Sequence, residues 1–335
     1  MTAGGVELSE TVFYSRRGNK VTVPSEWFGA CDASALGLSR AEMDARLLAR
    51  AREAGVCVLE ETQAAGLIVD EGRVRGVRLK TNGEVREVAS IVAVDATGRA
   101  RALARRLRKR HGANGHAVKK RAPLVAFKAH LENTRGASNH CEIYFYRGGY
   151  GGLNAVEGGL SNLCFIAAAR DVRACGGDAE RVMREILMTN ERAALTLRDA
   201  RARTEWLAVA LESFGRGKLV PADGLLAVGD AASFIDPFTG SGMLMALESG
   251  ELAAQAIARH LPTLRAGETF KRLAADYRAR YDERFSRRLR VCSMLRRAAF
   301  VPRLAELAML TIGASTRVLR RVARTTRKAR MRDER

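Results

Sequence analysis

The sequence predicts an α/β (α+β) fold in which a segmented sheet-and-helix domain carries an inserted antiparallel sheet and a helical carboxyl-terminal part. Two short apolar runs, residues 91–94 and 225–228, lead into Asp or Gly-Asp and then into helical patterns, as strands of an α/β sheet do. Residues 123–170 hold a series of alternating or apolar runs separated by Asn, Gly and Ser turns. From about residue 242 onward the pattern is helical.

The first strong helix signal covers residues 39–55. Ser39 and Glu42 have the spacing of a capping box, and Gly55 ends the pattern. Its apolar side chains share one predicted face, formed by Met43, Leu47, Ala51 and Ala54. Upstream of this helix, residues 11–14 and 21–23 predict a hairpin joined by a turn at residues 16–19.

Short strands follow this helix and predict a small antiparallel meander. They are expected at residues 56–60, 64–69, 74–80 and 84–89, with turns at Asp70-Glu71-Gly72 and Thr81-Asn82-Gly83. The strand at residues 91–94 then runs into Asp95-Ala96-Thr97-Gly98. A basic helix is expected from about residue 99 to 110.

The inserted sheet is predicted from four runs of residues, after which the chain forms helices. The four strands are expected at residues 124–131, 141–146, 149–156 and 162–168. Helices are expected near residues 178–190, and a strand at residues 204–210 is expected to return the chain toward the first domain.

The most informative stretch runs from Leu225 to Gly242. An aspartate at the carboxyl end of a buried strand, here Asp230, can accept hydrogen bonds from sugar or polyol hydroxyls. Gly240 and Gly242 allow close approach of a ligand because they carry no Cβ atom. The helix that follows directs its free N–H groups and its dipole at the same place. The stretch therefore predicts a ligand site at a helix amino terminus.

This stretch resembles the second flavin-contacting motif of FAD-dependent oxidoreductases, in the superfamily of p-hydroxybenzoate hydroxylase and geranylgeranyl reductase. The positions that carry the resemblance are Gly229, Asp230, Ala231, Ala232, Pro237, Gly240, Gly242, Ala246, Ser249 and Gly250. Ser241 stands where the reductase branch commonly has Glu. The resemblance implies that Asp230 binds the ribityl chain and that the backbone of residues 240–243 faces the isoalloxazine pyrimidine.

A second region resembles the same superfamily. Its helix matches at Arg40, Asp44, Leu47 and Gly55, and its strand end matches at Asp95, Thr97 and Gly98. The usual Ser after this strand end is replaced by Arg99-Ala100-Arg101, which weakens inferences about that turn.

The resemblance implies FAD as the cofactor and NAD(P)H as the electron donor. The cofactor-binding residues that it implies are Arg40, Asp95, Gly98, Gly229, Asp230, Pro237, Gly240, Ser241, Gly242 and Met243. It also implies that the inserted sheet forms a substrate wall, for which the candidates are Phe127, Phe145, Tyr150 and Leu153. The alternative for each of these four side chains is that it packs the sheet. No catalytic acid or base is named, and no metal site is predicted, since His and Cys residues lack ligand spacing.

The resemblance also implies an FAD/NAD(P)-binding Rossmann-like fold that is incomplete at its amino terminus. No G-x-G-x-x-G follows a predicted strand, although the superfamily places this dinucleotide fingerprint near its amino terminus. A chain without that βαβ unit is expected to have low stability and to bind FAD weakly. The predicted domain division is residues 1–110 and 204–262 for the FAD-binding domain, 111–203 for the substrate sheet, and 263–335 for the carboxyl-terminal helices and tail.

Three activities and one non-enzymatic alternative follow from the resemblance. A reductase would pass hydride from reduced flavin to a C=C bond of a hydrophobic small molecule, and Asp236-Pro237-Phe238-Thr239-Gly240 favours this branch. A monooxygenase would hydroxylate a hydrophobic substrate. A halogenase would need a Trp-x-Trp-x-Ile-Pro segment, and Gly151-Gly152-Leu153-Asn154-Ala155 occupies that stretch, so halogenation is disfavoured. The remaining alternative is a non-catalytic truncated fragment.

Composition limits the partners. The net charge is +20, but arginine is spread along the chain and no nucleic-acid motif occurs, so nucleic-acid function is disfavoured. Six cysteines without a C-x-x-C pair predict reduced thiols and a cytoplasmic location. Residues 316–335 hold nine basic and two acidic residues, a net charge of +7, and follow an apolar stretch. This tail predicts either peripheral contact with an anionic membrane or a solvated, fraying end.

Overall fold

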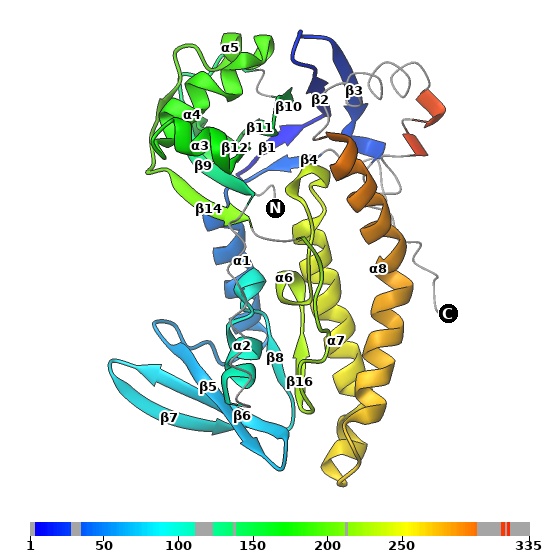
Figure 1. The fold of residues 1–335 in the computed structure, drawn as a ribbon. Coiled ribbons are helices and arrows are strands. Elements are labelled where there is room, and N and C mark those ends of the chain that lie inside the picture. Colours follow the sequence, from blue (N-terminus) through cyan, green and yellow to red (C-terminus); the bar gives the residue numbers. More distant parts are fainter. Residues whose placement is uncertain are drawn as a thin grey trace. The chain divides into compact units, whose positions relative to one another are not determined.

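The computed structural model describes residues 4–27, 35–110, 123–136, 139–211, 214–299, 316–318 and 320–321. These residues form two units. Unit 1 draws on Met1–Val56, Lys120–Ser213 and Met294–Arg335, and unit 2 draws on Cys57–Lys119 and Phe214–Ser293. Both units therefore consist of segments that are distant in the sequence (Figure 1).

A large sheet forms the centre of unit 1. Eight of the described strands belong to it, in the order β13-β9-β12-β11-β10-β2-β3, with β14 also paired to β9. Their bounds are β2 (Glu10–Tyr14), β3 (Lys20–Pro24), β9 (Leu124–Glu132), β10 (His140–Tyr146), β11 (Gly149–Ala155), β12 (Ser161–Ala168), β13 (Arg201–Ala202) and β14 (Leu207–Leu211). The β2–β10 pair is parallel and the other pairs are antiparallel. The four predicted sheet strands and the predicted hairpin are confirmed.

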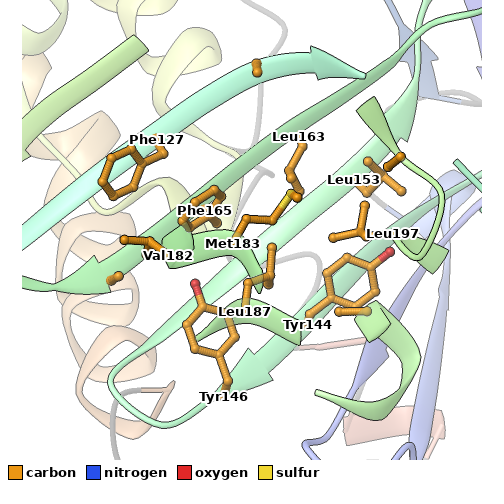
Figure 2. Close-up of a cluster of buried hydrophobic side chains, with 14 of the residues drawn as sticks. Phe127, Tyr144, Tyr146, Leu153, Leu163, Phe165, Val182, Met183, Leu187 and Leu197 are labelled. Carbon is orange, nitrogen blue, oxygen red and sulfur yellow. The ribbon is translucent and has the colours of Figure 1, made fainter. Parts of the chain in front are cut away.

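One face of this sheet packs against short helices, α3 (Ala169–Ala174), α4 (Ala179–Glu185) and α5 (Glu191–Thr196). Alternation along β12 turns Leu163, Phe165 and Ala167 toward this core. Figure 2 shows the aromatic and aliphatic side chains of the strands meeting Val182, Met183, Leu187 and Leu197 from the helical segment. The core of unit 1 is thus the layer between the sheet and these helices.

The helix predicted over residues 39–55 is confirmed as α1 (Arg40–Glu53), with two corrections. The Ser39 hydroxyl accepts from the N–H of Glu42 at 3.2 Å, but the N–H of Ser39 donates to Glu157 at 2.9 Å, so the capping box is not reciprocal. No side chain of α1 is buried, and Leu47 is 44% exposed. The predicted apolar face is present in the sequence, but the described residues do not bury it.

Unit 1 also contains a small two-stranded sheet, in which β1 (Val6–Leu8) pairs antiparallel with β4 (Ala35–Gly37).

Unit 2 contains the predicted meander. It consists of β5 (Gln63–Asp70), β6 (Arg73–Thr81) and β7 (Glu84–Ala89), paired antiparallel in sequence order. The strand expected at residues 56–60 is wrong: this segment is not a strand, since no described strand pairs with it. Propensity alone cannot form a strand without a partner for its N–H and C=O groups.

The other part of unit 2 combines short strands with long helices. Parallel strands β8 (Ala93–Asp95) and β16 (Leu225–Ala227) pair with each other, and β15 (Gly215–Arg216) pairs with β17 (Ser233–Phe234). The helices are α2 (Ala102–Arg110), α6 (Gly229–Ala232), α7 (Gly242–Arg265) and α8 (Lys271–Ala299), with 3-10 turns η2 (Gly98–Ala100) and η5 (Pro237–Thr239). The predicted helical carboxyl-terminal part is confirmed through residue 299, with a break at Gly267, whose φ is +92°.

Candidate flavin site and substrate face

Both flavin-like motifs lie at the carboxyl ends of the parallel strands of unit 2. Asp95 ends β8 and is paired in register with Ala227, which ends β16. The N–H of Val228 donates to the carbonyl of Asp95 at 3.0 Å. The turn after Asp95 and the loop after Val228 therefore leave the same edge of the sheet, which is where ligands bind in open α/β sheets.

Asp95 is fully buried and organises its own turn. One carboxylate oxygen accepts from the N–H and the hydroxyl of Thr97, at 3.0 and 2.6 Å, and the other accepts from the N–H of Ala104 at 3.2 Å. Gly98, with φ of +70°, begins η2 within this turn. Asp95 thus holds this turn and the first turn of α2 in place, and its role in a cofactor site stays a prediction.

The arginines that replace the usual Ser make contacts that the sequence did not reveal. Arg101 has φ of +47°, and its guanidinium lies against Gly217, where a Cβ atom would come within 2.6 Å of the Arg101 Cζ. Arg99 lies over the ring of Phe234 at 6.0 Å, and Phe234 stacks on Phe214 at 5.1 Å. The replacement of the usual Ser by Arg99-Ala100-Arg101 was the sequence feature that could have predicted these contacts.

Gly229 and the following helix are held by the small residues of the motif. Gly229 has φ of +56°, and its N–H donates to the Ser249 hydroxyl at 2.8 Å. A Cβ atom at Gly229 would lie 3.3 Å from the Cβ of Ala246. Gly229, Ala246 and Ser249 thus allow α6 to pack closely on α7. Asp230, on α6, is half-buried.

The first residues of α7 present free donors. Gly240 closes η5 with φ of +60°, and α7 begins at Gly242 after Ser241, whose side chain makes no capping bond. Within the described part of the chain, no acceptor is found for the N–H groups of Gly242, Met243 and Leu244. A Cβ atom on Gly242 would meet nothing within 4 Å. Unsatisfied N–H groups at a helix amino terminus fit the electron-rich carbonyl edge of a flavin, and the space beside the Cα of Gly242 is open.

Helix α8 contacts the carboxyl end of β16. The buried Tyr277 hydroxyl donates to the carbonyl of Ala227 at 2.7 Å, and burial raises the pKa of Tyr277 above its ordinary value. Tyr281 and Phe285 continue the same stripe at four-residue spacing, with ring centroids 4.6 Å apart. This spacing is visible in the sequence and could have identified the packing stripe. Glu248 on α7 accepts from Arg284 and Arg288 at 2.7 and 2.8 Å, which joins α7 to α8.

The four candidate wall residues lie on opposite faces of the large sheet. Phe127 and Leu153, each 2% exposed, point into the core under the helices, where Phe127 stacks on Phe165 at 5.0 Å (Figure 2). Phe145 and Tyr150 are register partners on the other face. Phe127 and Leu153 therefore pack the sheet. Phe145 and Tyr150 are buried as well, on the other face, and their place in a substrate wall stays a prediction.

A buried ionic network that the sequence reasoning missed lies on the helix side of this sheet. Glu142 is 1% exposed and accepts from Arg192 at 2.6 and 3.0 Å, from Tyr144 at 2.8 Å and from Thr196 at 3.2 Å. Burial disfavours its ionisation, but the hydrogen bonds of Arg192 and Tyr144 outweigh burial and hold the pKa of Glu142 below its ordinary value. The position of Glu142 within the largely apolar strand β10 was the sequence feature that could have predicted a buried ionic network. A cavity of about 360 Å³ adjoins Glu142 and His140.

Four further observations concern residues outside these two regions. Arg40 belongs to unit 1, where its exposed side chain pairs with Asp44 at 2.8 Å, so its place in a cofactor site stays a prediction. No cluster of metal-ligating side chains occurs among the residues that the structure describes. None of the described helices is long and apolar enough to cross a membrane. Most of the basic tail lies outside the described residues.

Comparison with known proteins agrees with this geometry. A family model described as an FAD binding domain matches residues 14–125. Digeranylgeranylglycerophospholipid reductase 2 of Methanopyrus kandleri is 25% identical over 288 residues, covering 84% of this chain and 67% of the relative. Digeranylgeranylglycerophospholipid reductase of Methanosarcina mazei is 26% identical, covering 75% of this chain. The chain spans 59% of the length of this second relative.

Solved structures show the same fold. A geranylgeranyl bacteriochlorophyll reductase-like protein from Thermoplasma acidophilum superposes with a TM-score of 0.73 at 19% identity, covering 97% of this chain and 81% of that one. A flavin-dependent brominase gives 0.74 at 20% identity, covering 97% and 78%. PqsL of Pseudomonas aeruginosa, a probable FAD-dependent monooxygenase, gives 0.67 at 18% identity, covering 90% and 81%. The predicted Rossmann-like flavoprotein fold is confirmed, and the chain is similar to FAD-dependent oxidoreductases in sequence and in fold.

Proposed function

We propose that the protein is a geranylgeranyl-reductase-like flavoenzyme that reduces C=C bonds of a hydrophobic small molecule, with NAD(P)H as the electron donor. The observation that carries this proposal is the uncapped amino terminus of α7, with its free N–H groups at residues 242–244 and the open space before Gly242. The named relatives, both lipid reductases, support the substrate class.

In this proposal the residues of unit 2 bind and orient the flavin. FAD supplies hydride transfer when it is bound. The backbone of residues 240–243 faces the pyrimidine edge, to which the N–H groups of Gly242 and Met243 donate, and Asp230 accepts from the ribityl hydroxyls. Asp95, Gly98, Gly229 and Pro237 fix the two loops that carry these contacts. The sequence lacks the G-x-G-x-x-G fingerprint that grips a pyrophosphate, so we expect weak FAD binding by this chain.

A flavin monooxygenase is the second candidate function. The likeness of the fold to PqsL, a probable FAD-dependent monooxygenase, favours it. The likeness to a brominase shows that this fold also occurs in halogenating proteins. The absence of Trp-x-Trp-x-Ile-Pro from the sequence still disfavours halogenation.

The first test is the visible absorption spectrum of the purified chain with added FAD, followed by chromatographic identification of the bound flavin. Gly242→Val fills the open space beside Gly242 and is expected to abolish flavin binding while the fold is kept. Leu247→Val, five residues further along α7 at a side chain that is 55% exposed, is the matched control. Equal flavin binding by both variants and the wild type would contradict the assigned site.

The second test separates the two activities and the non-catalytic fragment. Anaerobic oxidation of NADPH that depends on a polyprenyl substrate supports the reductase, whereas substrate-dependent oxygen consumption supports the monooxygenase. A protein without turnover in either assay would support the non-catalytic alternative.

Membrane association of the basic tail is a separate proposal. Its charge of +7 over residues 316–335 supports binding to anionic lipid. Pelleting with anionic liposomes should be strong for the wild type and weak for a chain that ends at Thr316, and equal, low binding would refute it.

A further inference from the structure

The short ladder that β15 and β17 form in unit 2 has one face against which arginine side chains pack. Gly215 is the register partner of Phe234. The pairing continues where the N–H of Gly217 donates to the carbonyl of Ala232 at 2.7 Å. Opposed residues of a ladder share a face, and so do residues two apart along one strand. These four positions therefore point to the same side.

Arg99 and Arg101 of the turn after β8 cover two of these positions. The guanidinium of Arg99 lies over the ring of Phe234 at 6.0 Å. The guanidinium of Arg101 occupies the place of a side chain at Gly217, where a Cβ atom would come within 2.6 Å of its Cζ and 2.7 Å of its Nη2. The two covered positions are two residues apart along the ladder, a separation of about 7 Å. Both positive charges thus lie on one face.

Arg101 has no anionic partner within the described part of the chain. Its Nε is buried and donates to no described residue. Its guanidinium takes part in no ion pair or hydrogen bond with the residues that the structure describes. The side chain is half-buried, and arginines that are withdrawn from water are normally paired. An arginine in this position without a partner points to an anion that comes from outside the chain.

The same face adjoins the candidate contact to the ribityl chain. Ala232, whose carbonyl holds Gly217, is the last residue of α6, and Asp230 lies two residues earlier in this helix. The turn η2 itself contacts α6. In FAD the pyrophosphate is bonded directly to the end of the ribityl chain. A flavin whose ribityl hydroxyls bind Asp230 therefore carries its two negative charges toward Arg101.

Guanidinium groups suit a pyrophosphate in geometry as well as in charge. The planar fork of an arginine donates two parallel hydrogen bonds to phosphate oxygens. Two such forks about 7 Å apart can bracket two linked phosphates. The sequence lacks the G-x-G-x-x-G that binds a pyrophosphate through backbone N–H groups, and Arg99-Ala100-Arg101 replaces the usual Ser.

We propose that Arg101, with Arg99 beside it, binds the pyrophosphate of FAD, so that side-chain charge serves here where the glycine fingerprint uses backbone N–H groups. Arg101 then makes this chain select FAD over flavins that have no pyrophosphate. This proposal rests on the flavin site of the proposed function and adds the residues that hold the charged middle of the cofactor.

The first measurement compares the dissociation constants of FAD and riboflavin for the purified chain, followed by flavin fluorescence anisotropy. Riboflavin has the isoalloxazine and the ribityl chain but no phosphate. The wild type should bind FAD about tenfold more tightly than riboflavin, which is the effect of one charge-assisted hydrogen bond. High salt should weaken the binding of FAD and spare that of riboflavin, because only the former has an ionic contribution.

Arg101→Ser should raise the dissociation constant of FAD about tenfold and leave that of riboflavin unchanged. Arg101→Lys keeps the charge but loses the planar fork, so its affinity for FAD should lie between those of the wild type and Arg101→Ser. Arg86→Ser is the matched control, because it removes an exposed arginine from β7 of the same unit. This control should bind both flavins as the wild type does.

ADP-ribose tests the same site without a flavin, since it carries the pyrophosphate and lacks the isoalloxazine. In scanning calorimetry, ADP-ribose should raise the transition temperature of the wild type and of Arg86→Ser, but not that of Arg101→Ser. Adenosine, which has no phosphate, should shift none of the three. An equal shift by adenosine and ADP-ribose would contradict recognition of the pyrophosphate.

Equal affinity of the wild type for FAD and riboflavin, or an affinity for FAD that Arg101→Ser leaves unchanged, would overturn the proposal. The wild-type comparison and its salt dependence decide the matter if a variant fails to fold. Absence of any flavin binding would refute the proposed function, whereas a shift by ADP-ribose that depends on Arg101 would still support the pyrophosphate site. Absence of both flavin binding and the ADP-ribose shift would refute both proposals.

Discussion

Replacing Glu142 by alanine is expected to destabilise unit 1 by about 3 kcal/mol. The carboxylate is 1% exposed and neutralises Arg192, whose side chain is 30% exposed. It also accepts from the fully buried Tyr144 hydroxyl at 2.8 Å. Alanine removes the acceptor of both donors and leaves a cavity between them.

The magnitude follows from the exposure of the two partners. Removing one member of a buried ion pair costs about 3–5 kcal/mol when the other stays unsolvated. Because Arg192 is partly exposed, water can solvate its guanidinium again, which favours the lower limit. The Tyr144 hydroxyl has no such access, and an unsatisfied buried donor costs about 1–3 kcal/mol on its own. These effects share one site and are not additive.

Urea unfolding followed by tryptophan fluorescence measures this change. Both tryptophans of the chain, Trp27 and Trp206, belong to unit 1, and Trp206 packs edge-on against Phe165 at 5.8 Å. The transition therefore reports on the unit that contains Glu142. Glu142→Gln keeps an acceptor oxygen for Tyr144 but loses the charge, so its midpoint should lie between those of the wild type and Glu142→Ala. A free energy of unfolding for Glu142→Ala that lies within about 0.5 kcal/mol of the wild-type value would refute the reasoning.

The pH dependence has a defined sign. Because the pKa of Glu142 is lower in the folded state than in the unfolded chain, its ionisation stabilises the fold above the unfolded pKa. This contribution is lost as the pH falls through the folded pKa. The stability difference between the wild type and Glu142→Gln should therefore shrink on acidification, and a difference that grows would contradict the assignment.

Three further predictions concern unit 2 and are measured by scanning calorimetry. Tyr277→Phe keeps the ring but leaves the buried carbonyl of Ala227 without its donor, and should cost about 1–3 kcal/mol; an unchanged transition would show that the bond contributes nothing. Asp95→Ala removes an acceptor of three hydrogen bonds and should cost about 2 kcal/mol, whereas Asp95→Asn, which keeps one oxygen, should cost less. Gly229→Ala adds left-handed strain of about 1–2 kcal/mol and a contact with Ala246, whereas Gly98→Ala adds strain alone, because its Cβ would meet nothing within 4 Å. Equal losses in these two variants would refute the role of Ala246.

Short-range signals explain what the sequence predicted correctly. The cap at Ser39, the turns at Asn82-Gly83 and Glu71-Gly72, and the period of two along β9 and β12 depend on residues a few positions apart. The motif from Gly229 to Gly242 is equally local, since its glycines, its proline and the start of α7 follow one another along the chain. For this reason both the fold class and the position of the candidate flavin site could be stated in advance.

Long-range pairing explains what the sequence left open. β2 lies parallel to β10, about 130 residues away, which places the amino-terminal hairpin in the large sheet of unit 1. The segment at residues 204–210 became β14 on the edge of the same sheet. Residues 56–60 had strand propensity but no described partner. Register and partner choice depend on surfaces that meet only in the folded chain.

The sequence by itself determined most of the elements, the fold class and the flavin-like motif, because each depends on backbone geometry and side-chain patterning within a few residues. Only the tertiary structure decided that Phe127 and Leu153 face the core while Phe145 and Tyr150 share the opposite face with Lys128. Likewise, Glu142 acquired its role only when Arg192, fifty positions away, came within 2.6 Å. The physical reason is that the face of a strand and the partner of a buried charge are set by packing against distant segments, which no local pattern encodes.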